Sequence, residues 1–496
     1  MTLHNMKILR SGIIAAAMAT MTMATAADRT MSITLDETIA RARSGSLEAA
    51  VALNTLKSAY WSYRSFRAEL LPEVNFNATL PSYTKSYNAY QLESGAYTFV
   101  RSNYLNATAT MSVDQSIWLT GGTLSVNTSL DFLRQLDERS SRFMTIPVAI
   151  KLTQPIFGVN TIKWDRRIEP VRYEEAKADF LSQTEGVAMT AITYYFNLLN
   201  SREQMSIARQ NLDNANRLYE VAKVKREMGQ ISRNDLLQME LNRLNAESAL
   251  TSAESAHKSH MFKLRSFLNI EDDVELVPEL PGPAPDVDIV YADVLDKAMT
   301  RNSLVKNVRR RQLEADYEVA KARGAMRDIS LFAQIGYTGT DRTLPEAYNS
   351  LRSNQVVEVG ISIPLLDWGK RRGRVKVAQS NREVTEIRLR QEVINFKEDL
   401  FILVERFNNQ QRQVDIASQA DTIAVQRYDT NVETYMIGRI STLDLNDSQT
   451  RKDEARIEYI SELYLYWYYY YQIRSLTLWD YAADTDIDTD FNLILK

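Results

Sequence analysis

Length, composition and charge narrow the class of protein before any motif is considered. The chain has 496 residues, a net charge of −4 and no cysteine, so nothing favours nucleic acid as a partner, and disulfides, cysteine metal sites and a lipidated N-terminal cysteine are excluded. Its 16 Gly and 11 Pro, with 25% charged residues, favour long helices over a loop-rich sandwich.

Residues 1–26 have the pattern of a secretory signal peptide. Lys7 and Arg10 precede a short apolar run at 12–23, and the small residues at 24–26 offer a cleavage site. The run is too short to span a membrane, and no later stretch has about 18 apolar residues without charges. The sequence therefore predicts an exported protein without a transmembrane helix.

The mature chain is expected to begin with a helix from about Ile33 to Leu71, which Pro72 ends. Between about 73 and 155, apolar residues instead recur at every second position, as strands require. In an exported chain without a membrane helix, this alternation predicts a barrel that is apolar outside and polar inside. The clearest runs are Val74, Phe76, Ala78 and Leu80, and Leu105, Ala107, Ala109, Met111 and Val113.

A very long helix is predicted next, from about Thr161 to Glu227. At 1.5 Å per residue, roughly 65 residues would span about 100 Å. A row of large residues recurs every seven positions beside a row of small ones, which predicts close coiled-coil packing. The two rows are Leu198, Met205, Leu212 and Tyr219, and Ser201, Ala208, Ala215 and Ala222.

Two similar stretches, at 228–238 and 435–447, are predicted to form the tips of helical hairpins. In each, a glycine ends one helix and a Ser-x-x-Asp sequence begins the return helix. Gly438 and Gly229 are 438 − 229 = 209 positions apart, and so are Pro364 and Pro155, since 364 − 155 = 209. A fixed offset between different landmarks predicts that one structural unit occurs twice.

The predicted organisation follows from this duplication. The first repeat covers 27–280, a proline-rich linker covers 281–288, and the second repeat covers 289–481, with strands at about 329–364. An acidic tail at 482–496 is expected to be solvated. The first repeat has 46 extra residues in its strand region, since Pro72 to Pro155 is 83 positions, Arg327 to Pro364 is 37, and 83 − 37 = 46. They are about enough for one additional strand hairpin, which either enlarges the barrel or forms an extracellular flap.

This order of elements, given twice behind a signal peptide, resembles the TolC-like outer membrane factor family. The motifs that carry the resemblance are 33–39 (ITLDETI), 152–157 (LTQPIF) and the two tips. The resemblance covers essentially the whole mature chain. It implies an α+β membrane protein: a homotrimer whose copies each give four strands to one outer-membrane β-barrel, continued by a long α-helical coiled-coil tunnel through the periplasm.

The resemblance also implies a function and a set of partners. The family forms exit ducts of tripartite efflux pumps and type I secretion systems in the outer membrane of Gram-negative bacteria. A periplasmic adaptor (membrane fusion protein), an inner membrane pump of the RND or ABC type, and outer membrane lipid would be the partners. The adaptor and pump choose the cargo, so the duct's own sequence does not specify it.

Gate residues are implied at the tips. Asp444 and Asp447 match the paired aspartates that ring the tunnel entrance, and Tyr435 matches the gate tyrosine. Asp235 matches the carboxylate that this tyrosine reaches on the neighbouring hairpin. Ile440 stands where the family carries a basic gate residue, so part of the closing network is expected to be absent or rerouted.

Helix capping is the alternative for two of these carboxylates. Asp235 and Asp444 each lie three residues after a serine, as in a capping box. Asp447 lies one turn further on, beyond the cap, and therefore discriminates between the two interpretations.

The tips are also the predicted docking surface for the adaptor. Glycine allows a tight turn there, and apolar residues beside it are expected to be exposed, as contact residues usually are. The predicted docking residues are Gly229, Gly438, Met228, Ile231, Ile437 and Ile440.

Three other features have ordinary explanations. His257 and His260 have no evident third ligand, so an exposed pair is expected rather than a metal site. The aromatic run at 464–471 lies near the end of a helix, so helix packing is expected rather than a membrane-interface belt. The basic run at 370–374 fits lipid headgroups or a solvated face equally well.

Three classes of function fit an exported chain of this length. A passive channel is favoured, because no nucleophile–base set or phosphate loop is evident, and neither an enzyme activity nor a cofactor is expected. The alternative is a structural coiled-coil envelope protein without transport activity, which has no need of strands with an apolar outer face. An exported hydrolase is disfavoured by the low glycine content.

Overall fold

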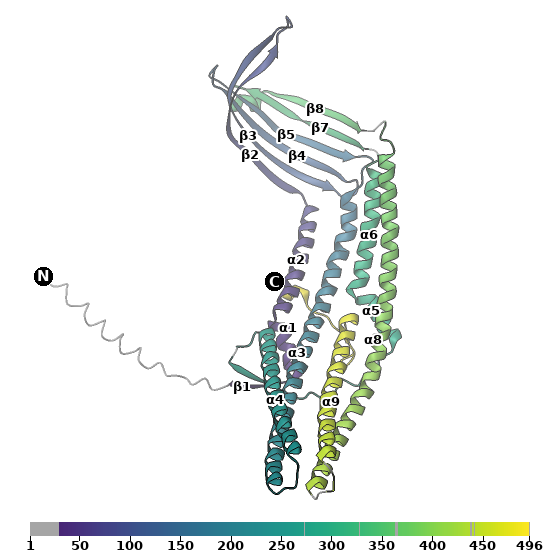
Figure 1. Ribbon diagram of the computed structural model, residues 1–496. Coiled ribbons are helices and arrows are strands. Elements are labelled where there is room, and N and C mark those ends of the chain that lie inside the picture. The colour runs from purple at the N-terminus through teal and green to yellow at the C-terminus, as the bar shows by residue number, and fades with distance from the viewer. Residues whose placement is uncertain are drawn as a thin grey trace, which may run out of the picture.

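A computed structural model describes residues 29–271, 273–326, 328–362, 366–436, 439–440 and 442–495. One antiparallel sheet lies at one end of the molecule, and long helices extend from it to two hairpin tips at the other end (Figure 1). The expected signal peptide, Ile437 and Gly438 lie outside the described residues. None of the helices in the described ranges is both long enough and apolar enough to cross a membrane.

The first half of the chain builds most of the sheet and one long hairpin. Its elements are β1 (Arg29–Ile33), α1 (Leu35–Gly45), α2 (Leu47–Glu69), β2 (Glu73–Gln91), β3 (Tyr97–Ile117), β4 (Gly122–Gln135), β5 (Ser140–Pro155), α3 (Thr161–Glu227) and α4 (Arg233–Leu268).

The second half repeats this order with fewer strands and adds a short tail. Its elements are β6 (Val274–Pro278), α5 (Tyr291–Arg301), α6 (Ser303–Gly324), β7 (Asp328–Asp341), α7 (Leu344–Asn349), β8 (Leu351–Ser362), α8 (Lys370–Met436), α9 (Thr442–Thr477), β9 (Trp479–Asp480), β10 (Thr485–Asp486) and α10 (Phe491–Ile494).

The long hairpins of the two halves correspond residue for residue. Helices α3 and α8 have 67 residues each, and α4 and α9 have 36 each. Their starting positions differ by 370 − 161 = 209 and 442 − 233 = 209, so the offset seen in the sequence is confirmed. Before the strands the offset is larger, since α6 and α2 start 303 − 47 = 256 positions apart. The extra residues therefore lie in the strand region.

The sheet has six strands in the order β2-β3-β4-β5-β7-β8, and all neighbours are antiparallel. The family pattern has four strands per copy, and the sequence predicted one hairpin more; the sheet contains this additional hairpin. The extra residues form β3 and β4, whose hydrogen-bonding edges are taken up by β2 on one side and β5 on the other.

The two faces of the sheet differ in polarity. On one face, a row of residues that pair across five neighbouring strands is entirely aliphatic: Val74, Val113, Val126, Ile150 and Ile335. A neighbouring row, on the opposite face, is polar throughout the same five strands: Glu73, Asp114, Ser125, Lys151 and Gln334. Successive residues of a strand point to opposite faces, so the period-2 pattern of the sequence becomes one apolar and one polar face.

The main core lies among the helices at mid-length and contains much of the aromatic run. Tyr466 and Tyr470 are almost fully buried, so helix packing, and not a membrane-interface belt, is confirmed for this run. Two residues of this run anchor the linker between the repeats: the Tyr466 hydroxyl donates to the Pro285 carbonyl at 3.3 Å, and Trp467 Nε1 donates to the Gly282 carbonyl at 2.9 Å.

One charged cluster is buried beside this core. Glu185 of α3 is 1% exposed and accepts hydrogen bonds from Arg43 of α1 and, at 3.0 Å, from Arg474 of α9. Arg474 also pairs with Asp480. Burial by itself opposes the charged form of Arg474, but the carboxylates of Glu185 and Asp480 outweigh it and raise its pKa. Three separate segments are thereby joined through one carboxylate.

The acidic tail is attached to the body, so the expectation of a fully solvated segment is partly wrong. Its strand β10 pairs with β9, and Phe491 of α10 contacts Phe180 of α3 with 6.4 Å between ring centroids. Asp486 forms an ion pair with Arg301. Most of the tail's carboxylates remain exposed, because only its apolar residues and Asp486 find partners on the helices.

Candidate functional site

The candidate site is the end of the molecule farthest from the sheet, where the α3–α4 and α8–α9 hairpins turn (Figure 1). At the first tip, the Gly229 amide donates to the Arg226 carbonyl at 3.0 Å, and the Gln230 amide donates to the Lys225 carbonyl at 2.9 Å. Gly229 has φ +75°, the left-handed conformation that this helix ending requires. The glycine is therefore explained by the turn itself.

The second tip repeats this ending. The Arg439 amide donates to the Thr434 carbonyl at 3.1 Å. Both partners lie 209 positions after those of the first tip, since 439 − 230 = 209 and 434 − 225 = 209. The same hydrogen bond therefore ends both long helices.

Asp235 forms a complete capping box at the start of α4. Its carboxylate accepts from the Ser232 amide at 2.9 Å and from the Ser232 hydroxyl at 2.7 Å, while its own amide donates to that hydroxyl oxygen at 3.1 Å. These bonds from the hydroxyl and the amide lower the pKa of Asp235. The structure thus shows the capping role, and the contact with Tyr435, whose side chain lies outside the description, stays a prediction.

Asp444 and Asp447 differ in their surroundings. Asp444 is exposed in the first turn of α9. Asp447, one turn later, accepts from Arg427 Nη2 of α8 at 2.8 Å and lies 3.8 Å from Arg451 Nε. Asp447 therefore joins the two helices of its own hairpin and does not cap either of them.

Arg427 and Arg451 are functional candidates that sequence reasoning missed. Arg451 could have been found, because it lies four residues after Asp447 on the same helix. Arg427 could not, because it reaches Asp447 from the facing helix. Both cations contact Asp447, and the rerouting of the closing network expected from Ile440 stays a prediction.

Further from the tip, polar contacts join the two hairpins to each other. Arg456 of α9 bridges Glu203 of α3 and Asp421 of α8, each at 3.2 Å. Nearby, Asn211 Nδ2 of α3 donates to the carboxylate of Asp453 at 3.2 Å. Burial raises the pKa of Asp453, although the Asn211 bond acts in the opposite direction.

Asp453→Asn should raise the melting temperature at neutral pH. Because the folded-state pKa of Asp453 is raised, its contribution to stability is lost as pH rises through that pKa, and the ionised carboxylate is the destabilising form. The gain should therefore shrink as the pH falls below the folded pKa. Thermal unfolding of both proteins across pH measures this, with Glu454→Gln, an exposed neighbour, as the control. An unchanged difference at all pH values would contradict the assignment.

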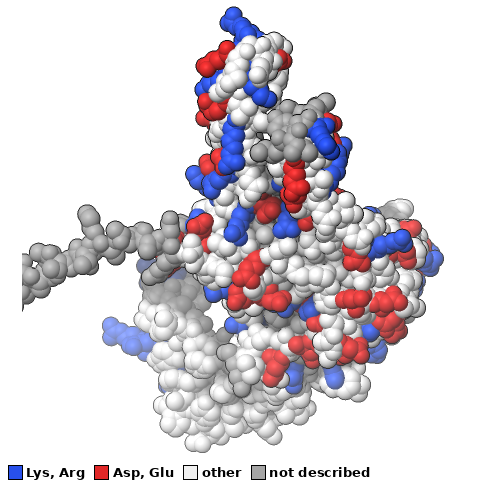
Figure 2. Space-filling view, turned by 90° about the horizontal axis from the view of Figure 1, so that it is seen from below, with Lys and Arg blue, Asp and Glu red and all other residues white. Residues whose placement is uncertain are grey.

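The exposure expected for the predicted docking residues is found for only some of them. Met228 is 65% exposed beside the first tip. Ile231 and Ile440 are half-buried, so the expectation that they are exposed is wrong, because the tight turns hold them close to the helix ends. Seen from the tip end, acidic and basic side chains are interspersed and do not form an area of one sign (Figure 2). Such a surface favours contacts made by shape and apolar residues over long-range attraction.

The histidine pair is half-buried, which corrects the expectation of an exposed pair. His257 Nδ1 lies 3.3 Å from the Ser201 hydroxyl on α3, and burial lowers the pKa of both His257 and His260. The helix α4 turns this face toward α3, which the local sequence does not reveal. Among the described residues, no group of three or more acidic, His or Cys side chains is arranged to hold a metal ion.

The basic run at the start of α8 has a structural role as well as exposed charges. Arg371 Nη1 donates to the Met326 carbonyl at 2.9 Å, which ties α8 to the end of α6. The backbone amides of Arg371 and Gly369 donate to Asp367 and lower its pKa. This contact fixes the junction between helices and sheet.

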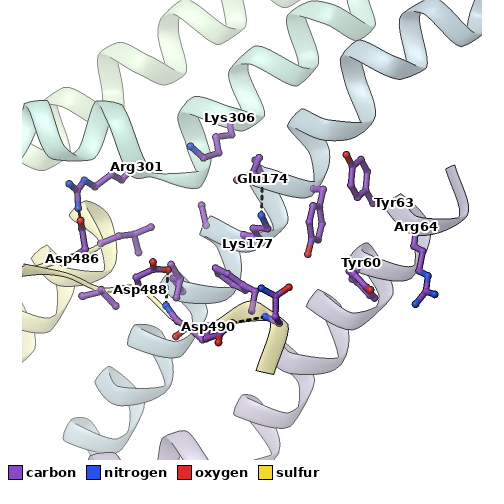
Figure 3. Close-up of a pocket in the computed structure, with 18 of the residues that line it drawn as sticks. Tyr60, Tyr63, Arg64, Glu174, Lys177, Arg301, Lys306, Asp486, Asp488 and Asp490 are labelled. Carbon is purple, nitrogen blue, oxygen red and sulfur yellow. Dashed lines mark hydrogen bonds and ion pairs between the residues drawn. The ribbon is translucent and has the colours of Figure 1, made fainter. Parts of the chain in front are cut away.

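A cavity of about 1170 Å³ lies between α2, α3 and the tail. Figure 3 shows Tyr60 and Tyr63 on one side and the tail's Asp486, Asp488 and Asp490 on the other. Lys177 pairs with Glu174 at 2.7 Å, and Arg301 pairs with Asp486. The Arg301–Asp486 pair joins α5 to the tail, whereas Lys177 and Glu174 both belong to α3. The cavity is not the candidate site.

A sheet with one apolar and one polar face, joined end-on to two helices of about 100 Å that each fold back in a hairpin, defines the class of outer membrane channel-tunnels. The chain belongs to the outer membrane efflux protein family, whose sequence model matches residues 38–269 and 294–468. Membership in this family places the protein in the outer membrane.

Solved structures share the fold at low sequence identity. The CmeC outer membrane channel of Campylobacter jejuni is 16% identical with a TM-score of 0.64, and the match covers 92% of this chain and 88% of that one. VceC of Vibrio cholerae is 14% identical (TM-score 0.60, covering 90% and 96%), and MtrE of Neisseria gonorrhoeae in its open state is 15% identical (TM-score 0.57, covering 92% and 91%). None of the curated proteins compared with the chain matches it.

Proposed function

We propose that the protein is the homotrimeric exit duct of a tripartite efflux pump or a type I secretion system, passing solutes without catalysis of its own. The observation that carries the proposal is the sheet. Among the described residues, its outer strands β2 and β8 each pair on one side only, and its apolar face is exposed. Unpaired strand edges are not tolerated in lipid, so copies of the chain must close the sheet into a barrel.

The barrel face and the helices then take distinct roles. The aliphatic row from Val74 to Ile335 would meet outer membrane lipid, and the polar row from Glu73 to Gln334 would line the passage. The long helices α3 and α8, about 100 Å each, and their return helices would continue the passage toward the inner membrane. A purely structural coiled-coil protein would have no use for these two faces.

Electron microscopy of the detergent-solubilised protein tests the assembly. A threefold-symmetric particle at least about 100 Å long, with density for a barrel at one end, is expected. A compact monomer or an open coiled-coil rod would contradict the proposal.

The tips are the proposed docking surface for a periplasmic adaptor, which in turn would connect the duct to an inner membrane pump. Gly229→Leu should abolish export while trimers still assemble, because the tip would be both bulkier and strained. A Cβ at Gly229 meets nothing within 4 Å in the chain itself, but the residue has φ +75°. The effect of backbone strain at position 229 must therefore be distinguished from the effect of a larger side chain.

Gly229→Asn separates them, since asparagine tolerates the left-handed conformation and still adds a side chain. If both variants lose export and adaptor cross-linking while remaining trimeric, added bulk at the tip blocks docking. Full export by Gly229→Asn would attribute the leucine effect to strain. Normal export by both variants would show that the docking surface lies elsewhere.

A further inference from the structure

We infer that the additional hairpin β3–β4 is part of the barrel wall and widens the outer membrane passage enough to admit solutes about 20 Å across. The inference rests on the proposed trimeric duct. Three copies then give 3 × 6 = 18 strands, whereas a hairpin outside the wall would leave 3 × 4 = 12. The connections identify the added strands: β2 follows α2 as β7 follows α6, and β5 precedes α3 as β8 precedes α8.

Strand β4 is paired on both sides over nearly all of its length, and β3 is paired on both sides from about Tyr104 to Asp114. Strand β3 pairs with β2 from Glu73–Asp114 to Gln91–Tyr97, and β4 pairs with β5 from Thr123–Thr153 to Gln135–Ser140. The pairing of β3 with β4 is continuous from Tyr104–Gln135 to Ile117–Gly122. A flap that lies outside the wall would leave β2 and β5 to pair with each other, and these two strands are separated by the hairpin.

The turn of the hairpin is built into the junction between sheet and helices. The Trp118 carbonyl accepts from Asn160 Nδ2, just before α3, at 2.9 Å, and the guanidinium of Arg166 lies 4.1 Å from the Trp118 ring centroid. Gln115 Nε2 donates to the carbonyl of Leu70, at the end of α2, at 3.1 Å. The turn is thus held between the two helices of the first repeat.

The hairpin also continues the polarity of its neighbours. Asp114 of β3 accepts hydrogen bonds from Ser125 of β4, from Ser112 at 2.7 Å and from Asn75 of β2 at 3.3 Å, all on the polar face. Val126 of β4 lies in the aliphatic row on the opposite face. Both faces of the sheet therefore run unbroken through β3 and β4.

The number of strands sets the width. With strands about 4.8 Å apart and tilted about 40°, 18 strands enclose a barrel about 36 Å across between backbones, and 12 strands one of about 24 Å. Inward side chains take about 5 Å from each wall, on the order of half the spacing of packed sheets, which leaves passages of about 26 Å and about 14 Å. The wider passage admits solutes about 20 Å across, which the narrower one excludes.

Single cysteines can test the position of the hairpin, because the chain has no native cysteine. Ser125→Cys and Val126→Cys probe the two faces of β4, and Asn77→Cys and Phe76→Cys probe β2 as matched controls. The full-length protein in lipid nanodiscs is treated with a charged maleimide. We expect Ser125→Cys and Asn77→Cys to react and Val126→Cys and Phe76→Cys to be protected.

The possible results separate the inference from the proposed function. If both β4 cysteines react while β2 still alternates, the hairpin lies outside the wall and the inference is wrong. If neither strand alternates, the proposed barrel itself fails.

The width is measured at Gln334→Cys, on the polar face of β7. In the full chain, this cysteine should react with maleimide-bearing polymers up to about 20 Å across, as an 18-strand barrel allows. Deleting residues 97–139 joins β2 to β5 through the existing turn at 92–96, and in this variant only small maleimides should react. If the full chain also excludes the larger polymers, the widened passage is refuted. Should the shortened variant fail to assemble, the full chain and the β4 cysteines still decide.

Discussion

Glu185→Ala should strongly destabilise the helical body, by about 3–5 kcal/mol. The carboxylate of Glu185 is 1% exposed and accepts from both Arg43 and Arg474. Its removal leaves the buried guanidinium of Arg474 with Asp480 as its remaining carboxylate partner. Water cannot reach the buried guanidinium to replace the lost carboxylate. The helices α1, α3 and α9 should therefore separate more easily.

The loss can be measured as a lower melting temperature of the detergent-solubilised protein and a smaller yield of assembled particles. Glu174→Ala is the matched control on the same helix, because its carboxylate is 55% exposed and pairs with Lys177 at the surface. That substitution should cost less than about 1 kcal/mol. Equal melting temperatures for the two variants would show that the buried cluster contributes no more than a surface ion pair.

Replacing both Asp444 and Asp447 by alanine should raise the conductance of the assembled duct and weaken its preference for cations. Three copies would bring 3 × 2 = 6 carboxylates around one axis at the narrow end, and carboxylate rings attract cations in other pores. The substitution also removes the Asp447–Arg427 contact that joins α9 to α8. Planar-bilayer recordings of the purified protein measure both quantities.

Two single variants separate charge from mechanical closure. Arg427→Gln breaks the same contact but keeps the carboxylates, so conductance should rise while cation preference is kept or increased. Tyr435→Phe should likewise raise conductance without changing selectivity, if the tyrosine hydroxyl ties neighbouring hairpins. A double aspartate variant with unchanged conductance and selectivity, but a lower melting temperature, would assign Asp444 to capping and Asp447 to hairpin stability.

The repeat and the long helices could be predicted from the amino-acid sequence. Heptad rows, glycine endings and Ser-x-x-Asp starts are local signals, because helices form through contacts between residues three or four apart. The offset of 209 is therefore visible in the order of residues, and it holds for both hairpins. The alternation in 73–155 likewise predicted strands with one apolar face, and the count of 46 extra residues predicted their additional hairpin.

The contacts between those elements could be found only in the folded structure. The place of β3 and β4 within the sheet, the burial of Glu185 among three segments and the contact of Arg427 with Asp447 all join residues distant in the sequence. The same holds for the half-buried histidines and for the attached tail, two points on which the sequence misled. Such contacts depend on which helix faces and strand edges are brought together, and local periodicity does not encode the choice of partner.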